Sequence, residues 1–92
     1  MPYRIEYEPE VLDELKHARG YYRGAARRRI SALAADPRPG DAEPLRDLPN
    51  AFKVRLKDWR LVWRVDDEER VVYILRAGLK EGPEFYEDLP NC

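Results

Sequence analysis

Basic residues are concentrated in one short stretch of the sequence, between positions 53 and 64. They are Lys53, Arg55, Lys57, Arg60 and Arg64, and only Asp58 offsets them. Clustered lysine and arginine side chains hold phosphate groups through charge-assisted hydrogen bonds. They can also support the cleavage of RNA, because the 2′-hydroxyl of RNA is itself the nucleophile. The protein then has to supply only a base, charge stabilisation at the phosphate and help for the leaving oxygen.

The other residue types that commonly do chemistry are scarce. His17 is the only histidine, and we expect it to be a surface residue of a helix beside Lys16. Cys92 is the only cysteine, which excludes an intramolecular disulfide and suits a reducing compartment. The carboxylates show no metal-loop spacing, and no glycine-rich phosphate loop occurs. We therefore expect no metal ion and no organic cofactor, so hydrolytic chemistry would depend on lysine and arginine.

The composition fits a single small domain over residues 1–92. The chain is 43% hydrophobic and 38% charged, and a core of this size cannot enclose a large substrate pocket. No run of eighteen apolar residues occurs, so we expect a cytoplasmic protein without membrane contact. The net charge of −1 argues against binding of nucleic acid through overall charge. A local basic face on a nearly neutral protein is still compatible with it.

The first half of the sequence predicts one strand and two helices. Residues 3–7 alternate in the manner of a half-buried strand. Pro9 then begins a helix whose apolar residues recur at helical spacing as far as Gly20. A longer amphipathic helix is expected over residues 21–35. Its polar faces carry Arg23, Arg27, Arg28 and Arg29. The prolines and the glycine of residues 36–41 cannot continue it.

The second half predicts an antiparallel meander of three strands, over residues 52–56, 59–65 and 71–76. Short turns at residues 57–58 and 66–69 connect them. Residues 82–89 are expected to form a turn or a short helix. The resulting β-α-α-β-β-β order indicates an α+β fold, in which two N-terminal helices pack on one face of a small antiparallel sheet.

Strand alternation sorts the side chains of the first two meander strands onto two faces of the sheet. The core side receives Phe52, Val54, Leu56, Trp59, Leu61, Trp63 and Val65. The opposite side receives Lys53, Arg55, Lys57, Arg60, Val62 and Arg64. We expect this second face to be open and basic, because the helices cover the first. The alternative is an ordinary solvated face, since one side of an antiparallel sheet is commonly polar.

Three segments of the second half form a recognisable pattern. They are PLRDLPNAFKVRL at residues 44–56, WRLVWRV at 59–65 and VVYIL at 71–75. Together they resemble the RelE/ParE toxin superfamily of type II toxin–antitoxin systems, and the strand aromatic-Arg-Leu-Val-aromatic is the most specific part. The order of elements agrees over nearly the whole chain. The resemblance implies a RelE-like microbial RNase fold.

The RelE-like branch of that superfamily implies a ribosome-dependent endonuclease that cleaves messenger RNA in the ribosomal A site and inhibits translation. Its metal-independent reaction would leave 2′,3′-cyclic phosphate and 5′-hydroxyl ends. By position, Lys53 falls on the general base, and Arg55 and Arg60 fall on the groups that stabilise the phosphate. Lys80 falls on the residue that assists the leaving group, and Tyr86 on the tyrosine that stacks on a base. The RNA- or ribosome-binding residues would be Lys57, Arg64, Arg23, Arg27 and Arg28.

Each of these residues also has a structural interpretation. Lys53 and Arg55 can be ordinary solvated side chains, and Arg60 can pair with a nearby carboxylate. Tyr86 can pack on the core instead of stacking on a base. Two departures from the family also stand out. Lys80 replaces an arginine and so loses its bidentate fork. The acidic segment after it and the pI of 5.9 contrast with the basic character of RelE-like toxins.

The partners that the resemblance implies are a cognate antitoxin, the ribosome and messenger RNA, with operator DNA bound only through the antitoxin complex. Two other functions fit the same superfamily. One is a ParE-like inhibitor of DNA gyrase, without nuclease chemistry. The other is a catalytically degenerate member that binds its antitoxin and contributes to autoregulation.

Overall fold

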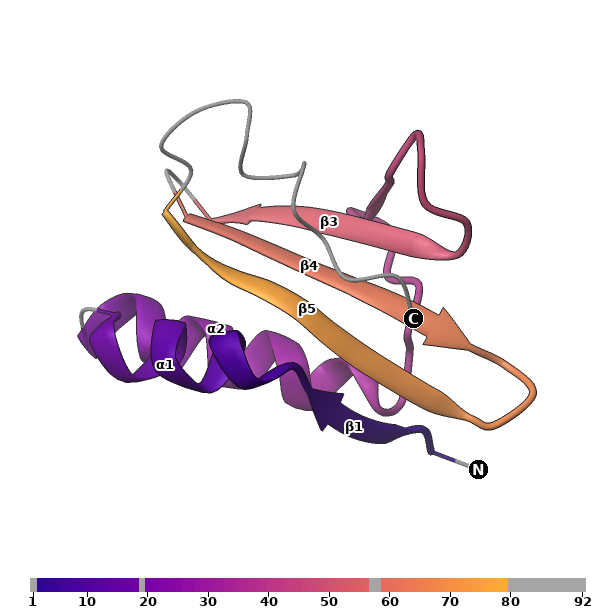
Figure 1. Cartoon of the computed structure of the whole chain (residues 1–92), viewed down its shortest axis with the longest axis horizontal. Helices are drawn as coiled ribbons and strands as arrows, with labels where there is room; N and C mark the ends of the chain where they lie inside the picture. Colours follow the sequence, from indigo (N-terminus) through magenta and orange to yellow (C-terminus); the bar gives the residue numbers. More distant parts are fainter. Residues whose placement is uncertain (1, 19, 57–58, 80–92) are drawn as a thin grey trace.

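The computed structural model describes residues 2–18, 20–56 and 59–79, which form two helices and a five-stranded sheet (Figure 1). The elements are β1 (Arg4–Tyr7), α1 (Pro9–His17), α2 (Gly20–Leu33), β2 (Glu43–Pro44), β3 (Ala51–Leu56), β4 (Trp59–Asp66) and β5 (Val71–Leu79). The turn at 57–58 and the segment expected at 82–89 lie outside the described residues. In the described part of the chain, neither helix is long and apolar enough to span a membrane.

The expected α+β fold is confirmed, with a sheet whose strand order is β1-β5-β4-β3-β2. The meander β3-β4-β5 is antiparallel as expected, whereas β1 pairs in parallel with β5. The short strand β2 was expected to be loop. It pairs Glu43 with Lys53 and Pro44 with Phe52. Since proline has no N–H to donate, a strand that contains Pro44 suits the edge of a sheet.

The two helices differ from expectation at their junction. Pro9 occupies the first turn of α1 and Glu8 is its N-cap, as the sequence indicated. Gly20 was expected to end this helix, but it is the first residue of α2. The helix α1 ends at His17 because Ala18 is extended, with φ −70° and ψ 143°. The helix α1 therefore ends before Gly20 and not at it.

The main core lies between the helices and one face of the sheet. Figure 1 shows α1 and α2 on the same side of the strands. The helices contribute Val11, Ala26, Ile30 and Leu33, and the sheet contributes Val54, Trp59, Leu61, Trp63, Val65, Val72, Ile74 and Ala77. The expected core side of β3 and β4 is confirmed at these positions, and Phe52 packs against the cluster while half-buried. The side chain of Leu56 is not among those described.

A β-bulge changes the face that the second half of β5 presents. Val62 pairs with Arg76, but the next residue, Trp63, pairs with Ile74, so Leu75 is an extra residue in β5. Ile74 and Ala77 both lie in the main core. Leu75 and Arg76, which lie between them, both face the opposite side of the sheet.

That opposite side is not uniformly basic and open. Val62 and Leu75 are buried there, and Leu45, Leu48 and Tyr73 pack against them while partly buried. The expectation of a fully open face is therefore wrong at its centre. The segment before β3 brings its leucines over the sheet, because Val62 and Leu75 would otherwise expose apolar surface to water.

A polar cluster ties the N-terminus, the loop after α2 and the β4–β5 turn together. Asp67 accepts two hydrogen bonds from Arg38, at 3.0 and 2.8 Å, and one from the Tyr3 hydroxyl at 2.6 Å. The indole N–H of Trp63 donates to the carbonyl of Pro37 at 2.9 Å. These contacts hold the proline-containing loop against the end of the sheet.

We expect this cluster to make stability depend on pH in the acid range. The hydrogen bonds from Arg38 and then Tyr3 lower the pKa of Asp67 from 3.8 to about 2. Because the folded-state pKa is depressed, the contribution is complete above pH 3.8 and is lost as the pH falls towards 2. The free energies of unfolding of Asp67→Asn and the wild type, measured in urea, should therefore differ at pH 7 and become similar near pH 2. Asp47→Asn, at an exposed loop position, is the control. If Asp67→Asn is still less stable than the wild type at pH 2, the ionised Asp67 carboxylate is not the source of the pH dependence.

Candidate nucleic-acid interface

Three of the expected site residues meet on the face of the sheet that lies opposite the helices. Arg55 of β3 and Arg60 of β4 are direct cross-strand partners. Lys53, two residues before Arg55 in β3, pairs with Val62 of β4. Directly opposed residues of antiparallel strands place their Cβ atoms about 5 Å apart. Arg55 is exposed, whereas Lys53 and Arg60 are half-buried. We call Lys53, Arg55 and Arg60 the basic face.

Arg60 is tied to its own strand. One terminal nitrogen of its guanidinium donates a hydrogen bond to the carbonyl of Trp59 at 3.2 Å. This contact holds the side chain close to the sheet surface. A guanidinium carries five N–H donors in a planar fork, a geometry that matches the oxygens of a phosphate.

Arg64 lies on the same side of the sheet but is engaged differently. It pairs with Ala51 on one side and Tyr73 on the other, and its guanidinium lies 4.6 Å from the centre of the Tyr73 ring. Its Nε atom is buried and has no hydrogen-bond partner among the described residues. Packing on the tyrosine, through a cation–π contact, therefore sets the position of this side chain.

Sequence reasoning missed Arg76, which lies on the same side of β5. The strand was expected to end there, whereas β5 continues to Leu79. Strict alternation from Val72 and Ile74 would also place Arg76 in the core, and the bulge reverses this. An arginine at a position where alternation predicts an apolar core residue was the available signal of a bulge.

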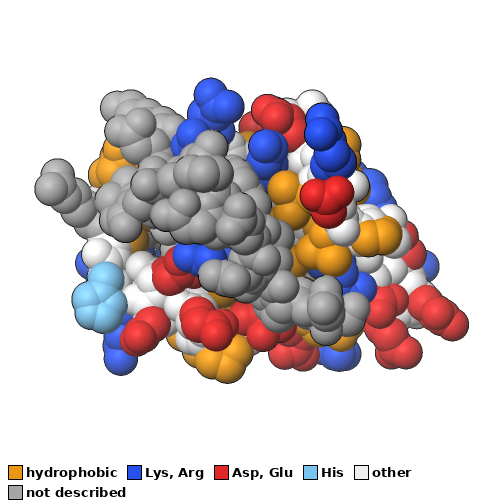
Figure 2. All heavy atoms as spheres, turned by 45° about the horizontal axis from the view of Figure 1, so that its top comes forward, with side chains coloured by type: hydrophobic (Ala, Val, Ile, Leu, Met, Phe, Trp, Pro, Cys, Tyr) orange, Lys and Arg blue, Asp and Glu red, His pale blue; other side chains and the backbone are white. Residues whose placement is uncertain are grey.

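Of the other expected residues, those on α2 are separated from the basic face. The side chains Arg23, Arg27 and Arg28 are exposed on α2, in the layer on the other side of the sheet. Lys57, Lys80 and Tyr86 lie outside the described residues. Figure 2 turns the upper side of Figure 1 forward and shows several Lys and Arg side chains along its upper part, with most acidic side chains along its lower margin.

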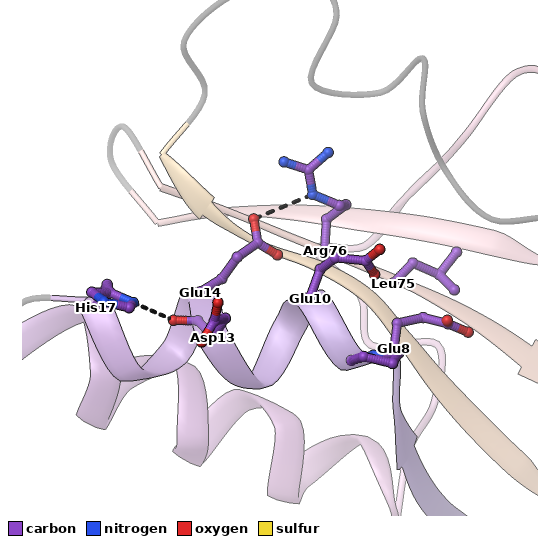
Figure 3. Close-up of a pocket in the computed structure, with 8 residues that line it drawn as sticks. Glu8, Glu10, Asp13, Glu14, His17, Leu75 and Arg76 are labelled. Atoms are coloured by element: carbon purple, nitrogen blue, oxygen red, sulfur yellow. Dashed lines mark hydrogen bonds and ion pairs between the residues drawn. The ribbon is translucent and has the colours of Figure 1, made fainter.

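A hollow of about 660 Å³ lies between α1 and β5 (Figure 3). Its lining includes Glu8, Glu10, Asp13, Glu14, His17, Leu75 and Arg76. His17 is exposed, as expected, and its Nδ1 lies 2.8 Å from the Asp13 carbonyl oxygen. The carboxylates come from α1 and its N-cap and repel phosphate on that side of the hollow, so the basic face is the better candidate for nucleic acid. In the described ranges, no three His, Cys, Asp or Glu side chains group closely enough to hold a metal ion.

Comparison with known proteins places the chain among the toxins of type II toxin–antitoxin systems. The family model described as ParE toxin of type II toxin–antitoxin system, parDE, matches residues 5–79. The mRNA interferase toxin RelE of Escherichia coli K12 is 28% identical over 90 residues, which cover 96% of this chain and 94% of the relative. The mRNA interferase RelE of Shigella flexneri gives the same values.

Solved structures agree with this placement. A mutant of the Escherichia coli toxin RelE in its free state matches with a TM-score of 0.81 and 27% identity, covering 96% of this chain and 94% of that one. The intact Escherichia coli RelBE toxin–antitoxin complex matches with a TM-score of 0.77 and 26% identity, covering 87% of this chain and 99% of that one. The RelBE2 toxin–antitoxin complex of Mycobacterium tuberculosis matches with a TM-score of 0.73 and 27% identity, covering 87% of this chain and 100% of that one. The chain belongs to the ParE toxin family of type II toxin–antitoxin systems, within the RelE/ParE superfamily.

Proposed function

We propose that this chain is the toxin of a type II toxin–antitoxin pair and that it acts as a ribosome-dependent messenger-RNA endonuclease. The observation that carries the proposal is the basic face, which places Lys53, Arg55 and Arg60 together on a fold shared with RelE. The relatives that align with nearly the whole chain are named mRNA interferases.

The proposed reaction uses the RNA's own nucleophile. Lys53 removes the proton from a 2′-hydroxyl, whose oxygen attacks the adjacent phosphorus atom while the bond to the 5′-oxygen breaks. Arg55 and Arg60 neutralise the charge that develops on the phosphate oxygens. The departing 5′-oxygen takes a proton, and the products are a 2′,3′-cyclic phosphate and a 5′-hydroxyl. Protein cations thus have the role that metal ions have in other nucleases, and the proposal involves no cofactor.

Two further residues complete the proposed site on the basis of sequence. Lys80 would protonate the leaving oxygen, and Tyr86 would stack on a nucleotide base. Both lie outside the described residues, so their roles rest on their positions in the family pattern. Lys57 and Arg64 would add contacts to RNA, and Arg64 would do so from its place over the Tyr73 ring.

The separation of the two basic surfaces suggests why the ribosome is needed. With a net charge of −1, the chain can attract RNA only through its local basic surfaces, and this attraction is weak at physiological salt. We propose that Arg23, Arg27 and Arg28 on α2 contact ribosomal RNA while the basic face meets the messenger on the other side of the sheet. The ribosome then supplies the positioning that a flat face cannot provide by itself.

The proposed partner in the resting state is a cognate antitoxin. The structural relatives include toxin–antitoxin complexes from Escherichia coli and Mycobacterium tuberculosis. We propose that an antitoxin segment covers the basic face, and that operator DNA is bound only through the complex. The compartment would be the cytoplasm, where ribosomes and messenger RNA are found.

The test uses purified protein and ribosomes that hold a defined messenger RNA with a known codon in the A site. The 5′ ends of the fragments are mapped, and a kinase that phosphorylates free 5′-hydroxyls labels them directly. Cleavage that occurs only on ribosomes, with labelled 5′ ends, is expected. If the protein arrests growth but leaves the messenger intact, the endonuclease proposal fails. Inhibition of gyrase supercoiling in that case would establish the ParE-like alternative.

A further inference from the structure

An ion pair between α1 and β5 lies beside the basic face. The Nε atom of Arg76 donates to Glu14 Oε2 at 3.2 Å, and the two side chains are only 26% and 21% exposed. The backbone N–H of Ala77 donates to the other carboxylate oxygen at 3.0 Å. Glu14 is thus fixed by the strand itself, and it fixes Arg76 through one nitrogen of the guanidinium.

The glycine that follows Ala77 leaves room for this arrangement. A Cβ atom at Gly78 would lie 3.0 Å from Glu14 Oε2, which is closer than ordinary van der Waals contact. Glycine therefore allows the carboxylate to lie directly against β5. Figure 3 shows Glu14 reaching up from α1, and the Arg76 guanidinium standing above β5 on the side away from the helices.

The strand register places Arg76 in one row with the proposed base. Val62 of β4 pairs with Lys53 on one side and with Arg76 on the other. Neighbouring strands lie about 4.8 Å apart, so the backbones of Lys53 and Arg76 are about 10 Å apart. Their long side chains flank the buried Val62. An RNA strand that passes over the leucines covering Val62 would have a cation on each side of it at this row.

We infer that Arg76 binds an RNA phosphate and that Glu14 is the positioning residue that holds Arg76 in place. The inference rests on the proposed function and extends its basic face from β3 and β4 onto β5. A guanidinium held in advance loses little conformational freedom when it binds a phosphate. An ion pair that only joins α1 to the sheet would contribute to stability without affecting RNA.

The salt dependence of RNA binding separates these two roles. The binding of a short single-stranded RNA to the full chain is measured by fluorescence anisotropy at several salt concentrations, for the wild type and Arg76→Gln. Loss of one phosphate contact on a single strand lowers the slope of log K against log salt by about 0.7. Arg76→Lys keeps the charge and should restore the slope. An unchanged slope in Arg76→Gln, or no binding by the wild type at low salt, would overturn the inference.

The matched control is Arg29→Gln. Arg29 is also a partly exposed arginine in an ion pair, with Asp41 at 2.7 Å, but it lies on α2 in the helical layer. Its substitution should leave the slope unchanged. An equal drop in both variants would mean that the effect comes from net charge alone, and it would count against a phosphate contact at Arg76.

The role of Glu14 is tested by Glu14→Gln in the ribosome assay, at a temperature where both proteins are folded. The variant keeps Arg76, so the salt slope should be unchanged. Cleavage should slow by roughly 10-fold, because misplacement of a binding group affects the reaction step. A purely structural Glu14 would lower the melting temperature and leave the rate of the folded protein unchanged, which would overturn its positioning role.

Failure of the proposed function can be distinguished from failure of the inference about Arg76. A wild type that shows the Arg76-dependent salt slope but does not cleave messenger RNA on ribosomes would sink the proposed function and leave the phosphate contact standing. A wild type that cleaves, with Arg76→Gln matching Arg29→Gln in both slope and rate, would remove the inference alone.

Discussion

Lys53→Ala is expected to abolish ribosome-dependent cleavage, with a loss of at least about 100-fold in rate. The reason is that removal of a general base typically costs 10²–10⁴-fold. The variant should fold normally, since Lys53 is half-buried on the face opposite the main core. Single-turnover cleavage of a defined messenger RNA on ribosomes measures the effect, and unfolding in urea checks the fold.

Two further variants separate the base from the charge. Lys53→Arg keeps a positive charge, but a guanidinium does not lose its proton in proteins, so this variant should bind and not cleave. Lys16→Ala removes an exposed lysine from α1 and should cleave like the wild type. If Lys53→Arg retains most of the wild-type rate, Lys53 acts through its charge and another group is the base.

The fold could be predicted from the sequence where a single period governed each segment. Alternation along β3 and β4 assigned the core positions Val54, Leu61 and Trp63 correctly. It could not show that β1 joins the sheet beside β5 in parallel, because pairing between distant strands leaves no mark in either one. The β5 bulge was invisible for a related reason, since an extra residue breaks the period on which the prediction depends.

The candidate site was predictable only where it lies on adjacent strands of one hairpin. The tight turn expected at residues 57–58 implies the register of the two strands, so Arg55 and Arg60 could be placed opposite each other from sequence alone. Arg76 could not be found, because its face depends on the bulge and its orientation on Glu14, 62 residues earlier in the chain. The arginines of α2 were correctly expected to lie on a helix, but only the layering shows that they face away from Lys53.

The core position with the largest expected effect on stability is Trp63. Its side chain is fully buried between the helices and the sheet, packs against Phe52, and donates its indole N–H to Pro37. Trp63→Ala should lower the free energy of unfolding by about 3–5 kcal/mol, because it removes the ring and leaves a cavity. A chain of this length is stable by only about 5–15 kcal/mol, so the loss is a large share of the total.

Urea unfolding of a graded pair of variants tests whether packing or the hydrogen bond dominates at this position. Trp63→Phe keeps most of the apolar ring but leaves the Pro37 carbonyl without its indole donor. Loss of this hydrogen bond should account for about 1 kcal/mol of the decrease in the free energy of unfolding of this variant. Tyr21→Ala, at an aromatic residue that is 67% exposed, should change stability by less than about 0.5 kcal/mol. If Trp63→Phe is as destabilising as Trp63→Ala, the anchoring of the loop at Pro37, and not the filling of the core, is what the tryptophan chiefly provides. In that case the loop after α2, which also carries Arg38, would be required to hold the sheet that presents the basic face.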